Sequence, residues 1–96
     1  MIFCDIHCHS KKLNSFFYGC NTAARGGMTS WTKTRLLPRI IAKRTIKFSL
    51  KHSHFKIEED KLGTGRVVVW DELGVTNSFT FENSYYGFIN SQNQVE

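Results

Sequence analysis

The chain has 96 residues, enough for one modest domain, and its composition of 41% hydrophobic and 14% aromatic residues excludes a disordered protein. Its apolar runs are too short to span a bilayer, and its first residues lack the order of a secretory signal, so a cytoplasmic protein without a membrane segment is expected. The net charge of +5 is uneven, because no acidic residue occurs between Asp5 and Glu58. Such a basic face attracts nucleic acid, an acidic membrane or a polyacidic peptide.

The first half of the chain predicts a strand, a second short element and a loop. "MIFCDIH" is a short apolar run with β-forming residues, which is typical of a buried strand. "SFFYG", at 15–19, is aromatic and ends in glycine, so it predicts either a second short strand or a packed loop. "CNTAARGGMTS", at 20–30, contains two adjacent glycines and predicts a loop.

The second half predicts a helix, then an ambiguous segment, then a strand. In "RLLPRIIAKR", at 35–44, apolar residues repeat with a helical period, and Pro38 requires the helix to begin near Leu37 or to bend there. "RVVVWDEL", at 66–73, is β-branched and favours a strand by propensity, although Gly74 after it also suits the end of a helix. "SFTFE", at 78–82, alternates polar and aromatic residues and predicts a strand that ends at its glutamate.

Potential metal ligands cluster near the start of the chain. Cys4, His7, Cys8, His9 and Cys20 do not follow the C-x2-C or H-x3-H spacings of structural zinc sites. On a strand, neighbouring side chains alternate between faces, so the two histidines point away from the cysteine between them. A complete local zinc site is therefore not expected. An odd number of cysteines close to histidines favours reduced thiols over a disulfide framework.

Glu82 is the other residue with potential chemistry. It stands at the predicted end of the last strand, near Phe79, Phe81, Tyr85 and Tyr86. If these aromatic residues shield it, its carboxylate can act as a general base beside a metal. The alternative is an ordinary acidic residue that faces water.

Two stretches of the chain resemble the cytosolic carboxypeptidases, the tubulin-deglutamylase branch of the zinc metallocarboxypeptidases. "CDIHCHSKKLNSFFYG" resembles the segment that carries the third zinc ligand of that family, in a motif of aspartate, apolar residue, histidine, glycine, histidine and serine. "GTGRVVVWDELGVTNSFTFENSYYGF" resembles the closing segment, in which a threonine, apolar, glutamate triplet supplies the catalytic base. The intervening "RLLPRIIAK" also fits, so the resemblance covers most of residues 2–89.

The resemblance implies a role for individual residues. His7 corresponds to the zinc ligand, and Glu82 corresponds to the general base that activates water. His9 and Ser10 would line the substrate cleft. Arg66 is expected to pair with an acidic side chain of the substrate, because a guanidinium group binds carboxylates with a planar fork. The resemblance further implies a short helix in place of the strand at 67–73, and we adopt the helix.

The resemblance also implies an incomplete catalytic domain. Cys8 stands where the family has glycine, and Lys11 stands where it has arginine. The first two zinc ligands of the family, a histidine and a glutamate separated by two residues, lie upstream of the matched region. We therefore expect residues 1–89 to form the C-terminal portion of a mixed-sheet α/β/α zinc carboxypeptidase domain, followed by a polar tail at 90–96.

Partners and a rival function follow from these interpretations. The carboxypeptidase interpretation implies zinc as cofactor, acidic polypeptide tails such as those of polyglutamylated tubulin as substrates, and the missing N-terminal part of the catalytic domain as partner. The rival is a small basic nucleic-acid-binding module with a metal held by the cysteine and histidine cluster. No recognised nucleic-acid-binding motif supports that rival.

Overall fold

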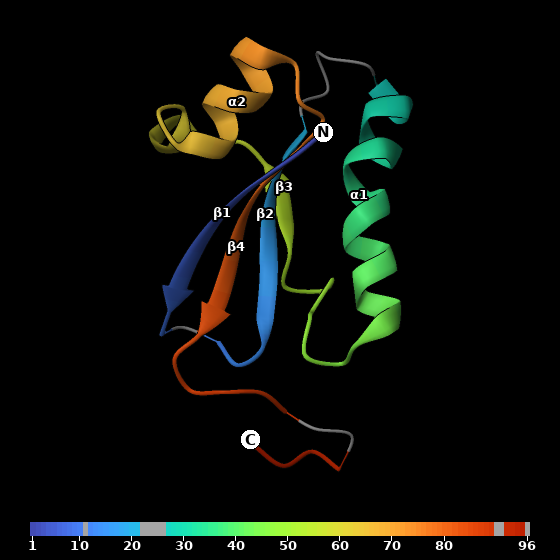
Figure 1. Ribbon diagram of the computed structural model, residues 1–96, viewed down its shortest axis with the longest axis vertical. Helices are drawn as coiled ribbons and strands as arrows, with labels where there is room; N and C mark the ends of the chain where they lie inside the picture. Colours follow the sequence, from blue (N-terminus) through green and yellow to red (C-terminus); the bar gives the residue numbers. More distant parts are fainter. Residues whose placement is uncertain (11, 22–26, 90–91, 96) are drawn as a thin grey trace.

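The computed structural model describes residues 1–10, 12–21, 27–89 and 92–95, which fold as a four-stranded sheet with a helix on each face (Figure 1). Lys11, parts of the predicted loop at 20–30 and of the polar tail, and the last residue fall outside these ranges. The elements in chain order are β1 (Ile2–His9), β2 (Ser15–Asn21), α1 (Gly27–Arg44), β3 (His54–Lys56), the 3-10 helix η1 (Glu59–Lys61), α2 (Gly65–Leu73) and β4 (Asn77–Ser84).

The sheet is mixed, with strand order β1-β4-β2-β3. β4, the last strand in the sequence, lies between the first two, parallel to β1 and antiparallel to β2, while β3 runs parallel to β2. The carboxyl ends of β1 and β4 therefore meet at one edge of the sheet (Figure 1). This topology confirms the predicted α/β class with a mixed sheet.

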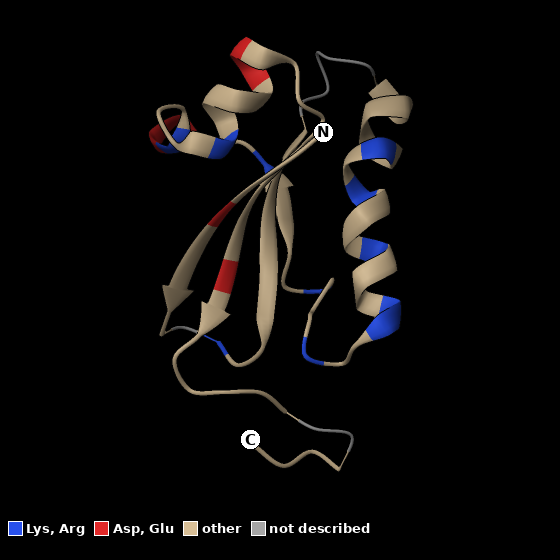
Figure 2. Ribbon diagram, viewed as in Figure 1, with Lys and Arg blue, Asp and Glu red and all other residues tan. Residues whose placement is uncertain are grey.

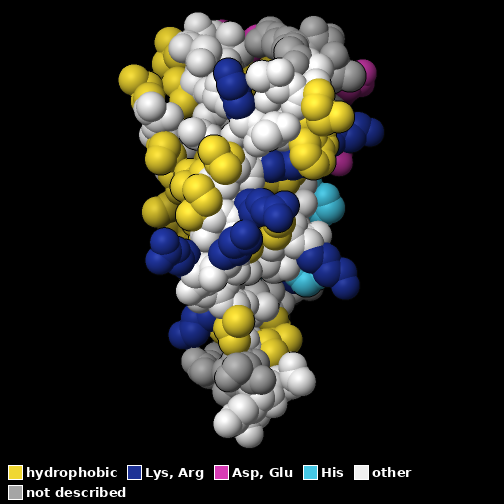
Figure 3. Space-filling model, turned by 90° about the vertical axis from the view of Figure 1, so that its right-hand side faces the viewer, with side chains coloured by type: hydrophobic (Ala, Val, Ile, Leu, Met, Phe, Trp, Pro, Cys, Tyr) yellow, Lys and Arg dark blue, Asp and Glu magenta, His cyan; other side chains and the backbone are white. Residues whose placement is uncertain are grey.

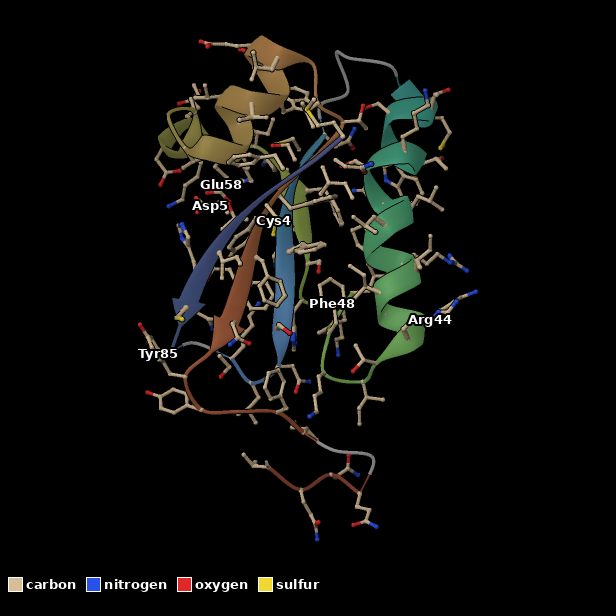
Figure 4. All side chains as sticks on the ribbon, in the orientation of Figure 1. Cys4, Asp5, Arg44, Phe48, Glu58 and Tyr85 are labelled. Atoms are coloured by element: carbon tan, nitrogen blue, oxygen red, sulfur yellow. The ribbon has the colours of Figure 1, made fainter. Side chains whose placement is uncertain are left out.

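Alternation along the strands separates the two faces of the sheet. Phe17 and Phe79 lie on the face covered by α1, where their rings stack with centroids 4.5 Å apart. Phe48 and Phe55 complete this buried cluster, and Figure 4 shows Phe48 between the sheet and α1. The opposite face is covered in part by α2, whose first residue, Gly65, lies against the ring of Phe3.

The helix α1 is longer than the sequence predicted. It runs through Pro38 instead of beginning near it. A proline inside a helix removes one backbone hydrogen bond. Here Pro38 and Thr34 are both buried on the side that packs against the sheet, and this packing compensates for the lost bond. The last turn carries Lys43 and Arg44, which suit the negative end of the helix dipole.

The segment after η1 is a helix, as the family resemblance predicted and strand propensity did not. Thr64, in extended conformation, precedes the first turn of α2. Gly74 ends the helix with a φ of 69°, a left-handed conformation that glycine adopts without a steric penalty. The carbonyl of Arg66 in the first turn accepts hydrogen bonds from Ser78 Oγ, at 2.6 Å, and from the Cys20 thiol, at 3.6 Å. These bonds attach α2 to the two central strands.

Two strand predictions were wrong in detail, and one short strand was not predicted. β1 is an exposed edge strand and not a buried one, because α1 packs over the other strands and leaves Ile2 and Ile6, at 58% and 71% exposed, uncovered. β4 does not end at Glu82 but continues to Ser84, since its pairing with β1 continues to His9. The short strand β3 carries no alternation that would have predicted it. Among the described residues, no helix is both long and apolar enough to cross a membrane.

Candidate active site

The two residues assigned by the resemblance to metal binding and catalysis lie side by side. His7 on β1 is the register partner of Glu82 on β4, so both side chains project from the same face of the sheet. His7 Nδ1 lies 3.8 Å from Glu82 Oε1. Residues 75 positions apart in sequence are thus brought together by one pair of parallel strands. This face is the one that α2 covers in part, opposite the aromatic core.

The other ring nitrogen of His7 is held by Asp5. His7 Nε2 lies 3.0 Å from Asp5 Oδ2, within hydrogen-bonding distance. Asp5 is two residues earlier on the same strand and therefore on the same face, near the start of α2 (Figure 4). When Nε2 donates to this carboxylate, Nδ1 is left as the acceptor nitrogen facing Glu82. The aspartate of the motif thus orients the histidine.

Glu82 is shielded from water, but not by the aromatic residues that the sequence suggested. Its side chain is only 12% exposed. Phe79 and Phe81 occupy odd positions of β4 and point to the opposite face, and Tyr85 is largely exposed. The shielding comes instead from β2, where Phe16 is its register partner. Because side chains alternate along β4, Phe81, the neighbour of Glu82 in the sequence, lies on the opposite face of the sheet and cannot shield it.

The negative charge of Glu82 affects the pKa of Tyr18 on the neighbouring strand β2. Burial raises the pKa of the Tyr18 hydroxyl above its ordinary value, and the negative charges of Glu82 and Glu58 raise it further, while Arg66 opposes the rise. The hydroxyl is protonated at neutral pH, as in an ordinary tyrosine, and can donate a hydrogen bond.

A cavity of about 690 Å³ opens beside this pair. Four of the five residues selected from the sequence line it: Glu82, His9, Ser10 and Arg66. The fifth, His7, stands next to the cavity through its contact with Glu82 but does not line it. The volume is in the range of ligand pockets in proteins. The structure therefore brings the predicted site residues together around one space.

His9 and Arg66 are held in place by contacts inside the fold. The Nδ1 atom of His9 accepts a hydrogen bond from the backbone N–H of Lys12, at 3.3 Å, and its ring packs on Phe16 with centroids 4.7 Å apart. Arg66 is 5% exposed, and its Nε donates to the Gly19 carbonyl at 3.2 Å. Its guanidinium carbon lies 5.5 Å from the centroid of the Tyr18 ring. Both side chains reach the cavity from fixed positions.

Five further polar or charged residues of the cavity were not predicted from the sequence. Tyr18 is neutral, and the other four carry charges of both signs, as Figure 2 shows for the elements around the cavity: Lys12, Glu58, Asp60 and Lys61. Tyr18 and Lys12 stand within the quoted first motif, so their proximity to the histidines was a usable signal. The other three come from the segment around η1, which no motif connects with the site.

The described residues do not complete a metal centre. A catalytic zinc requires three protein ligands, and no group of three or more histidine, cysteine, aspartate or glutamate residues in the described ranges is arranged to hold a metal ion. His7 is a single candidate ligand. The described part of this chain alone therefore does not fit a catalytic zinc. The rival nucleic-acid-binding interpretation also needs a metal site, and the described residues form none.

Comparison with known proteins identifies the family. The chain is 40% identical over 97 residues to cytosolic carboxypeptidase 4 of Homo sapiens, and 41% identical over 88 residues both to cytosolic carboxypeptidase 2 of Homo sapiens and to cytosolic carboxypeptidase 3 of Bos taurus. Each match covers 91% of this chain. The chain belongs to the cytosolic carboxypeptidase family. This confirms the resemblance drawn from the two motifs and places the chain in a family of peptidases, which are hydrolases.

The match covers only a small part of each relative. The chain spans 9% of the length of the relatives named above. No general family model matches the sequence.

Proposed function

We propose that this chain forms part of a zinc carboxypeptidase site that removes C-terminal or branched glutamates from acidic protein tails, such as those of tubulin, in the cytoplasm. The observation that supports this most is the register of β1 and β4, which sets His7 3.8 Å from Glu82 beside the cavity. Family membership supplies the reaction class. In this proposal zinc is held by His7 together with ligands from outside the described residues.

Glu82 serves as the proton acceptor in this proposal. A peptide bond is hydrolysed when water attacks its carbonyl carbon, and the attacking water must lose a proton as the new bond forms. A glutamate that is 12% exposed at the wall of the cavity is positioned to take this proton and then to give it to the leaving amine. Asp5 acts on the neighbouring histidine by fixing its ring orientation through the 3.0 Å contact.

Substrate selection is assigned to one basic residue of the cavity. Arg66 is proposed to pair with the carboxylate of a glutamate side chain, and its place in the cavity wall supports this role. Lys12 and Lys61 line the same cavity, where Glu58 and Asp60 balance their charge and Lys61 Nζ lies 3.9 Å from Asp60 Oδ2, so the selection is assigned to Arg66. His9 and Ser10 are proposed to contact the substrate at the mouth of the cavity.

We further propose that one face of β1 contacts the rest of a carboxypeptidase catalytic domain. β1 is an edge strand whose α1-side residues include Ile2, Cys4, Ile6 and Cys8, all exposed. Unpaired edges and uncovered apolar positions are features that proteins normally protect. We therefore assign this face to contact with the remainder of a carboxypeptidase domain.

The proposal is tested by rebuilding a complete site. The upstream half of a related cytosolic carboxypeptidase, which carries a histidine and a glutamate as zinc ligands, is fused before Met1. The chimera is expected to bind zinc and to release glutamate from a polyglutamate-tailed peptide. His7→Ala should lose both zinc and turnover, because it removes a ligand. A folded chimera that binds zinc without His7, or that binds zinc and releases no glutamate, would contradict the proposal.

A further inference from the structure

A second hollow lies on the other side of the molecule, between α1 and the segment 50–56 that contains β3. It has a volume of about 560 Å³ and shares no lining residue with the cavity beside Glu82. We name it the α1–β3 groove. Its α1 wall comes from the stretch between Trp31 and Arg39, and its other wall comes from the stretch between Leu50 and Lys56.

The centre of the groove is a stack of aromatic rings around one guanidinium group. The Arg35 guanidinium carbon lies 4.3 Å from the ring centroid of Trp31 and 4.3 Å from that of Phe55. Arg35 Nη1 also donates to Asn21 Oδ1, at 3.3 Å, and to the Trp31 carbonyl, at 3.1 Å. These contacts hold the cation in one orientation, so little conformational entropy is lost when it binds an anion.

The charge of the groove has one sign. Its charged lining residues are Arg35, Arg39 and Lys56, all cations, and the sequence between Asp5 and Glu58 supplies no carboxylate to neutralise them. Burial lowers the pKa of Arg35 from its ordinary value, as expected for a cation partly withdrawn from water. In such surroundings attraction to a carboxylate is less screened than in bulk water.

The groove is also apolar. Leu36 and Leu50 line it and are 58% and 36% exposed, beside Trp31 at 49%. Figure 3, which looks onto the side of the molecule where α1 lies, shows basic side chains set among hydrophobic ones, with acidic side chains only at the margin of the view. An apolar surface interrupted by fixed cations matches a polypeptide in which carboxylates alternate with apolar side chains.

We propose that the α1–β3 groove docks an acidic polypeptide segment that carries apolar side chains between its carboxylates. A nucleic acid fits the groove less well. Its bases need free aromatic faces for stacking, whereas the Trp31 ring is stacked by Arg35 and the Phe55 ring is buried. The leucine side chains also match aliphatic groups, which nucleic acids lack. This docking is separate from the proposed peptidase chemistry and does not rest on it.

The test uses the 96-residue chain and a short fluorescein-labelled peptide of alternating glutamate and leucine, with binding followed by fluorescence anisotropy. Arg39→Glu and Lys56→Glu should each weaken binding about five- to tenfold, since each reverses one exposed contact. Lys33→Glu is the matched control, because Lys33 is an exposed cation of the same helix that does not line the groove, stands two residues from Arg35 and so on another side of the helix, and makes the same change in net charge. It should change binding by less than about twofold at physiological salt, where charges further apart than roughly 8 Å are screened.

Several outcomes would overturn the proposal. Equal losses in Arg39→Glu and Lys33→Glu would show attraction by the whole basic face and no specific groove. Undiminished binding of a glutamine-leucine peptide would show that the carboxylates are not recognised. Undiminished binding of a glutamate-serine peptide would show that the apolar side chains are not recognised. Tighter binding of a single-stranded oligonucleotide, lost in Arg39→Glu, would assign the groove to nucleic acid. A dimer of the parent chain that dissociates in Arg39→Glu would assign it to a second copy.

Discussion

Gly19 lies at the closest approach between β2 and the aromatic core, and Gly19→Ala should destabilise the fold. An added Cβ would lie 2.6 Å from one carbon of the Phe55 ring and 3.3 Å from a carbon of the Phe79 ring. The first distance is far inside van der Waals contact. Phe55 cannot easily move away, because it is buried and the Arg35 guanidinium lies 4.3 Å from its centroid. The clash must be relieved by a shift of packed groups.

The magnitude follows from two opposing effects. Overpacking a core costs about 1–3 kcal/mol. Replacing glycine by alanine also restricts the unfolded chain, which stabilises the fold by about 0.4–1 kcal/mol. The net loss should be about 1–2 kcal/mol in the free energy of unfolding, or a fall in Tm of roughly 4–16 °C for a domain of this size.

Urea unfolding followed by circular dichroism measures this loss, with Gly63→Ala as the matched control. Gly63 is exposed, and an added Cβ there meets no atom within 4 Å, so the control should match or slightly exceed the parent in stability. Phe55→Leu combined with Gly19→Ala should recover part of the loss, with a coupling of at least about 0.5 kcal/mol. A Gly19→Ala chain as stable as the parent would refute the packing described for β2, β3 and β4.

Two further predictions concern the site residues and the thiols. Calorimetric titration of zinc into the chain should show no tight stoichiometric site, because His7 is one ligand where three are needed; a tight site lost in His7→Ala but kept in Cys4→Ala and Cys8→Ala would contradict this. Burial raises the pKa of Cys20 to about 11, and burial and the charge of Asp5 raise the pKa of Cys4, so Ellman's reagent at neutral pH should react first with Cys8, more slowly with Cys4, and with Cys20 only on unfolding. Equal rates for all three thiols would show that Cys20 is accessible.

Local sequence patterns predicted the elements that bury one face and expose the other. β4 could be predicted because Phe79 and Phe81 alternate with polar residues, and this alternation matches a sheet with one aromatic face. The apolar composition of β1 could not distinguish an edge strand from a central one, since exposure depends on where α1 packs. The start of α1 was missed because Pro38 normally ends or begins a helix, and only packing against the sheet allows the helix to pass through it.

The site depended on long-range pairing that local patterns do not encode. Spacing alone gave no reason to join His7 with Glu82; the family resemblance gave that pairing, and the register of two parallel strands confirms that the residues are neighbours. The role of Phe16 in shielding Glu82 followed from β2 pairing with β4, which the sequence order of the strands does not suggest. Tyr18 stands within the first quoted motif, but its place in the cavity beside Glu82 depends on β4 entering the sheet between β1 and β2.

The role of Glu82 is the central claim, and one substitution in the zinc-loaded chimera tests it most directly. Glu82→Gln keeps the size of the side chain and its hydrogen-bonding shape but removes the proton acceptor. General-base catalysis contributes roughly 100- to 10,000-fold, so the rate of glutamate release from a polyglutamate-tailed peptide should fall by at least about 100-fold. The zinc content should equal that of the parent chimera. Nearly full turnover by the Glu82→Gln chimera, at the same zinc content, would contradict the account, because the proton acceptor would then have to be another residue.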